Sequence, residues 1–126
     1  MAEVELHPEI EMVRHLAPDL RLDDELIRTL RTSGVATPTP DLSDAVQRVD
    51  HVVDADPRVV VRVHRPRDVT GTLPAIVWIH GGGYVLGSYD MDAPRFDRWG
   101  PDLGMVAVSA EYRLAPETPY PGPLED

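Results

Sequence analysis

Apolar residues recur at helical spacing in two short stretches near the start of the chain. The first begins after Pro8 and ends at Pro18, because proline is tolerated in a first turn but interrupts a helix further along. The second carries acids in its first turn and arginines in its last, which suits the helix dipole, and Gly34 follows as a stop signal. Its apolar stripe consists of Leu22, Leu26, Ile27 and Leu30. Two amino-terminal helices are predicted.

An extended linker, residues 34–44, contains two prolines. After it, the spacing of the apolar residues changes from the helical pattern to that of strands. Residues 46–53 read weakly as a strand. Valines then alternate with polar residues over 59–64, as they do in a half-buried strand. Two neighbouring strands of this kind predict an antiparallel pair at the edge of a sheet.

Two later segments, Ala75–Ile79 and Met105–Val108, are apolar at every position. Such runs predict central strands buried on both faces. Between them Pro94 can open a helix through Trp99, which Gly100-Pro101 should end or kink early. Strand, helix and strand in this order predict an α/β unit with a parallel pair of strands. The strand that ends at Val108 would leave an unpaired apolar edge, which is an aggregation hazard unless another segment covers it.

Composition narrows the possible functions. The 126 residues carry a net charge of −10 and are 42% hydrophobic, which predicts a folded chain that is repelled by nucleic acid and by anionic membranes. The start lacks the pattern of a signal peptide and no apolar run is long enough to span a bilayer, so we expect a cytoplasmic protein. Cysteine and lysine are absent, which excludes disulfides, thiolate chemistry and lysine-based phosphate loops. The five scattered histidines show no metal-ligand spacing, and we expect neither a metal nor another cofactor.

The densest chemical signal is the segment His80-Gly81-Gly82-Gly83-Tyr84, directly after an apolar strand. Consecutive glycines let the backbone turn sharply and present its N–H groups to a negative oxygen. A dinucleotide site would need a glycine where Leu86 stands, and a phosphate loop would need a lysine. An oxyanion hole for acyl transfer remains, which is the use of an HGGG-type turn in α/β hydrolases.

Together with the downstream segment Tyr112–Glu117 (YRLAPE), this turn resembles the hormone-sensitive-lipase-like family of α/β-hydrolase carboxylesterases. The resemblance implies an α/β class fold and hydrolysis of small carboxylic esters. It divides the chain into a helical cap segment and linker, residues 1–44, and the amino-terminal part of the hydrolase core, residues 45–126. That part would hold antiparallel edge strands and the start of the parallel sheet.

The resemblance also implies roles for individual residues. Gly82 and Gly83 would donate backbone N–H groups to the oxyanion, Gly81 would shape the turn, and His80 would orient it without acting as the base. Tyr84 would line the acyl pocket or belong to the core. In the second motif Arg113 and Glu117 would make buried polar contacts that fix the loop, and Asp126 would lie at the start of the next helix.

A serine hydrolase of this fold needs a Ser in GxSxG followed by an acid and a His. None of the four serines lies in that frame; Ser109, for example, falls in a predicted strand. All five histidines precede the position where the nucleophile should occur. We therefore expect a second chain or fragment to carry the triad, leaving this chain alone inactive. A non-catalytic ligand-binding relative and an inactive truncated product stay open as alternatives.

Overall fold

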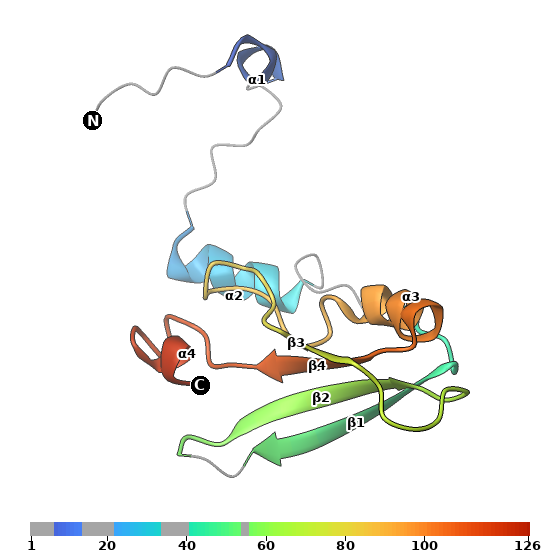
Figure 1. Ribbon diagram of the computed structural model, residues 1–126. Helices are drawn as coiled ribbons and strands as arrows, with labels where there is room; N and C mark the ends of the chain where they lie inside the picture. Colours follow the sequence, from blue (N-terminus) through green and yellow to red (C-terminus); the bar gives the residue numbers. More distant parts are fainter. Residues whose placement is uncertain (1–6, 14–21, 34–40, 54–55) are drawn as a thin grey trace.

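The computed structural model describes residues 7–13, 22–33, 41–53 and 56–126 (Figure 1). Its centre is a four-stranded sheet in the order β1-β2-β4-β3. The strands are β1 Val46–Val53, β2 Val59–Pro66, β3 Ala75–Trp78 and β4 Val106–Glu111. The helices are α1 Pro8–Val13, α2 Asp24–Thr32, α3 Ala93–Leu103 and α4 Gly122–Glu125.

The sheet confirms the predicted strand pairs. β1 and β2 form an antiparallel hairpin in which Val49 lies opposite Val63. β2 also pairs antiparallel with β4, whereas β3 and β4 run parallel and are connected through α3. The chain therefore has the predicted α/β class, with antiparallel strands at one edge and the beginning of a parallel sheet.

Helix α3 covers one face of the sheet and is longer than predicted (Figure 1). It continues through Pro101 and ends at Gly104, which adopts the left-handed conformation at φ 59°. Packing outweighs the local helix-breaking tendency, because Gly100 lies against Val46 and Pro66, where an added Cβ would be 3.6 to 3.7 Å from their side chains. Of the two outcomes predicted at Gly100-Pro101, the early end is therefore wrong, and the kink stays a prediction.

The opposite face of the sheet is largely open. Val77 and Ile79 are 72% and 69% exposed, so the prediction that Ala75–Ile79 is buried on both faces is wrong for this chain. β3 is an edge strand because only β4 pairs with it, whereas β4 pairs on both sides. The unpaired edge thus belongs to β3, and the prediction that placed it at the strand ending at Val108 is wrong as well.

The two amino-terminal helices differ in how they contact the rest. α2 begins after Asp23, whose carboxylate accepts the Leu26 amide at 2.8 Å, and it buries Ile27. α1 has no buried residue, and the predicted extension of that helix beyond Val13 lies outside the described residues, as do residues 34–40 of the linker. The proposed division into a cap segment and a core remains a prediction.

Candidate active site

The glycine turn lies at the carboxyl end of β3, where the chain adopts three successive positive φ angles. They are 122° at Gly82, 62° at Gly83 and 62° at Tyr84. The carbonyl of Gly82 accepts the amides of Val85 and Leu86 at 3.1 and 3.0 Å. Within the part of the chain that the structure describes, the amides of Gly82, Gly83 and Tyr84 donate to no protein acceptor. Adjacent free amides of this kind can bind an anionic oxygen.

The three predicted glycines differ in how strictly their positions require glycine. At Gly82 an added Cβ would lie 2.0 Å from the carbonyl oxygen of Leu86, so no side chain fits there. At Gly83 there is open space, and only the positive φ favours glycine. Gly81 has neither constraint, and its role in shaping the turn remains a prediction.

His80 is built into the scaffold of the turn. It is 4% exposed, and its ring stacks on Tyr112 with centroids 4.2 Å apart. The Tyr112 hydroxyl donates to the His80 carbonyl at 2.7 Å, and His80 Nδ1 donates to the Gly81 carbonyl at 2.8 Å. Burial raises the pKa of Tyr112, which keeps this hydroxyl a donor. These contacts fix the position of the His80 ring, and its orienting role in the turn remains a prediction.

Gly87 is a part of this arrangement that the sequence analysis missed. Its φ is 102°, and a Cβ there would lie 2.3 Å from His80 Nδ1 and 2.6 Å from the Gly81 carbonyl oxygen. Only glycine lets the returning chain pass this close to the histidine. The signal in the sequence is the glycine four positions after Gly83.

Tyr84 lies at the surface rather than in the core, with 52% of its area exposed. It borders an apolar groove of about 290 Å³. The other lining residues are Ala115, Tyr120, Pro123 and Leu124. The groove thus reaches the turn at the residue that follows the glycines, and an apolar groove there has the form expected of a site for a small ester or acyl group.

The YRLAPE loop is held by two arginines. Arg113 donates from Nε to both carboxylate oxygens of Asp126, at 2.8 and 3.0 Å, and this contact lowers the pKa of Asp126. Glu117 is not buried as predicted, since 59% of its side chain is exposed. It accepts a hydrogen bond at 2.8 Å from Arg31 of α2, which lowers the pKa of Glu117. Asp126 lies at the end of α4 and not at a helix start.

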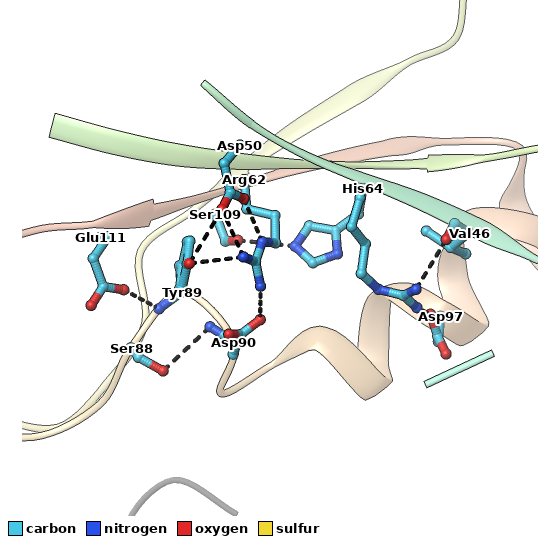
Figure 2. Close-up of polar contacts among 11 residues, drawn as sticks. Val46, Asp50, Arg62, His64, Ser88, Tyr89, Asp90, Asp97, Ser109 and Glu111 are labelled. Atoms are coloured by element: carbon cyan, nitrogen blue, oxygen red, sulfur yellow. Dashed lines mark hydrogen bonds and ion pairs between the residues drawn. The ribbon is translucent and has the colours of Figure 1, made fainter. Parts of the chain in front are cut away.

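Figure 2 shows a separate polar cluster between the sheet and α3. Arg62 donates to Asp50 at 2.6 and 2.8 Å, pairs with Asp90, and lies over the Tyr89 ring at 4.0 Å. The hydrogen bonds from Arg62 lower the pKa of Asp50. The cluster fixes the segment after the glycine turn to the edge of the sheet, and its charges are already compensated.

His64 and Ser109 in the same region form a pair that resembles a base and a nucleophile (Figure 2). Nε2 of His64 and Oγ of Ser109 are 3.0 Å apart, but each residue is only 1% exposed. Burial, reinforced by the positive charges of Arg48 and Arg62, lowers the pKa of His64 to about 4. A pair closed to substrate holds the sheet together, and the geometry gives Ser109 no access to an ester.

Over the residues that the structure describes, no group of three or more His, Asp or Glu side chains could hold a metal ion. Nor is any helix in those ranges long and apolar enough to cross a membrane.

Comparisons with known proteins agree with this architecture. Residues 76–126 match a family model described as an alpha/beta hydrolase fold. The chain is 34% identical over 100 residues to Carboxylesterase NlhH of Mycobacterium tuberculosis, covering 79% of this chain and 30% of that protein. It is also 34% identical over 122 residues to 2-hydroxyisoflavanone dehydratase of Glycyrrhiza echinata, covering 92% of this chain and 37% of the relative.

Further matches point the same way. Hormone-sensitive lipase of Ictidomys tridecemlineatus is 34% identical over 70 residues, which are 56% of this chain and 9% of the lipase. The solved structure of a bacterial heroin esterase superposes with a TM-score of 0.70 at 32% identity, covering 94% of this chain and 39% of the esterase. The chain thus spans well under half the length of these relatives. It belongs to the α/β-hydrolase fold family that includes the carboxylesterases and hormone-sensitive lipases.

Proposed function

We propose that this chain is the amino-terminal portion of a serine carboxylesterase and supplies its oxyanion hole. The observation that carries the proposal is the glycine turn, where the amides of Gly82 and Gly83 have no acceptor among the described residues and adjoin an apolar groove at Tyr84. Ester hydrolysis passes through a tetrahedral intermediate with a negative oxygen. Fixed backbone donors stabilise that charge without having to reorganise during the reaction.

In this mechanism the present chain supplies only the oxyanion donors. The serine nucleophile, the acid and the base come from polypeptide outside this sequence, and the serine attacks the ester carbonyl to form an acyl-enzyme that water hydrolyses. Gly82 and Gly83 bind the oxygen that becomes negative in each step. Loss of one side-chain donor from the oxyanion hole of other hydrolases costs about 3 to 4 kcal/mol of transition-state stabilisation.

The open face of the sheet supports a contribution from further polypeptide. Val77 and Ile79 are highly exposed, and they border a hollow of about 330 Å³ together with Val59, Val61, Ala110 and Tyr112. Contiguous exposed apolar surface on a sheet normally packs against another segment. We propose that the polypeptide carrying the triad covers this face.

The test is an ester assay in two settings. Residues 1–126 are fused in front of the remainder of a related carboxylesterase, and short-chain p-nitrophenyl esters are offered to the fusion and to the chain alone. The proposal expects hydrolysis by the folded fusion and none by the chain. Hydrolysis by the purified chain alone would overturn the proposed division of labour.

A second candidate rests on the match to a protein named as a dehydratase, which covers nearly all of this chain. The same amino-terminal architecture thus occurs in a relative that is not named as an esterase. A dehydratase, or a non-catalytic binder, would place the groove and the amides against a ligand without acyl transfer. Trapping of an acylated serine in the fusion, observed by intact mass, would favour the esterase over both.

A further inference from the structure

The side chain of Arg31 connects helix α2 to both loops of the candidate site. Its Nε donates to the Val85 carbonyl at 2.9 Å, and its Nη2 donates to the Ala115 carbonyl at 2.6 Å. Its Nη1 donates to Glu117 Oε2 at 2.8 Å. The side chain is 24% exposed, so these bonds are partly shielded from water. One guanidinium therefore joins segments that lie 54 and 84 residues further along the chain.

These contacts close a ring around the glycine turn. The Ala115 amide donates to the Tyr84 carbonyl at 2.8 Å, while the Ala115 carbonyl accepts from Arg31. Arg31 in turn donates to Val85, the residue bonded to Tyr84. The carbonyls of both Tyr84 and Val85 are thus fixed from outside the turn.

The turn needs such anchors because its own conformation is costly. Tyr84 has a side chain and yet adopts φ 62°, a region that costs an ordinary residue free energy. The Gly82 carbonyl accepts the amides of Val85 and Leu86, whereas the Gly83 carbonyl accepts no hydrogen bond from the described residues. Without outside contacts, the peptide planes on either side of Gly83 would be free to rotate.

We propose that Arg31 is a positioning residue that sets the direction of the Gly82 and Gly83 amides and so couples helix α2 to the oxyanion site. The inference rests on the proposed function of the turn. Arginine suits this task because its planar group carries donors in a fixed geometry, whereas the single ammonium of lysine cannot reach three separated acceptors at once. Glu117 compensates the charge and holds the guanidinium in place.

Hydrogen exchange of the folded chain tests the structural half of the proposal. The variants are Arg31→Gln and Arg31→Lys, with Arg28→Gln as the matched control. Arg28 lies on the same helix, is 65% exposed, and pairs with Asp24 at 3.9 Å. We expect the Val85 and Leu86 amides to exchange about tenfold faster in Arg31→Gln and by an intermediate factor in Arg31→Lys. The amides of β2 and β4 should be unchanged, and the control should match the wild type.

Unchanged exchange at Val85 and Leu86 would overturn the proposal, and so would an equal acceleration throughout the sheet, which indicates general destabilisation. If Arg31→Gln fails to fold, Glu117→Gln takes its place, since it leaves Arg31 and both carbonyl contacts present. We expect about threefold faster exchange confined to the same amides in that variant. An unaltered turn in Glu117→Gln would then contradict the proposed ring.

The esterase fusion tests the catalytic half. Arg31→Gln should lower kcat about tenfold and leave KM unchanged, because oxyanion donors act on the transition state and not on the bound ester. A normal kcat in this variant would overturn the coupling. An inactive wild-type fusion would instead contradict the proposed function, and the exchange result would remain interpretable by itself.

Discussion

Acid should destabilise this fold through His64 before it affects the carboxylates. His64 is buried beneath α3 with its Nε2 3.0 Å from Ser109 Oγ, and its pKa is lowered from 6.5 to about 4. Desolvation is the main cause, followed by the charges of Arg48 and Arg62, against which Asp90 and Asp50 act weakly. The folded state therefore keeps a neutral imidazole where the unfolded chain takes up a proton.

The pH dependence of stability follows from the difference between the folded and unfolded pKa values of His64. Because the folded pKa lies below the unfolded one, the stabilisation from neutral His64 is complete above pH 6.5 and is lost as the pH falls toward 4. A difference of about 2.5 pKa units corresponds to about 3 kcal/mol in the free energy of unfolding. Below pH 4 both states are protonated and the loss stops growing.

Urea denaturation at pH values from 7.5 to 3.5 measures this effect. His64→Gln is the reference variant, because an amide can still hydrogen-bond Ser109 but does not titrate. The wild type should lose about 3 kcal/mol more than the variant between pH 6.5 and 4. Parallel curves for the two proteins, or an NMR titration that places the His64 pKa near 6.5, would refute the reasoning.

Three further predictions concern the turn, the polar cluster and the open face. Gly82→Ala should cost at least about 2 kcal/mol of stability, because its Cβ would collide with the Leu86 carbonyl. Gly83→Ala should cost about 1 kcal/mol, because the space there is open and only the positive φ is unfavourable. Thermal denaturation of the two variants measures the difference. Arg62→Lys should cost about 2 kcal/mol in urea denaturation, since it loses the paired donors to Asp50, and an unchanged midpoint would contradict the role of the cluster. Val77→Ser should reduce self-association of the chain, measured by sedimentation. Val52→Ser in β1, where Val52 is 58% exposed, should not.

The periodic elements could be predicted from the sequence because their causes are local. The hairpin of β1 and β2, the parallel pair around α3 and the boundaries of α2 each follow from alternation, apolar runs or charges within one segment. The early end predicted for α3 is wrong because tertiary packing outweighs the local helix-breaking tendency of Gly100-Pro101. The contact of Gly100 with Val46 and Pro66 lies more than thirty residues away in sequence and cannot be read from the helix itself.

In the candidate site, too, local features can be predicted from the sequence and contacts between distant segments cannot. The segment from His80 to Tyr84 is recognisable because glycine has a distinct backbone freedom. The partners that hold it are not, since Arg31 reads as an ordinary basic residue of a last helical turn. Its contacts with Val85 and Ala115 exist only once α2 and the two loops meet in space. Likewise, the exposure of Val77 depends on what packs over its face of the sheet, and a run of apolar residues does not reveal that.

The oxyanion role of the turn is tested most directly by NMR of the Gly82 and Gly83 amides in the carboxylesterase fusion with an alkylboronic acid. Boronic acids form a tetrahedral adduct with an active serine and so present an anionic oxygen to the donors. The account predicts that both amide protons move downfield on binding, because each then donates a charge-assisted hydrogen bond. An inhibited fusion in which neither amide shifts would contradict it.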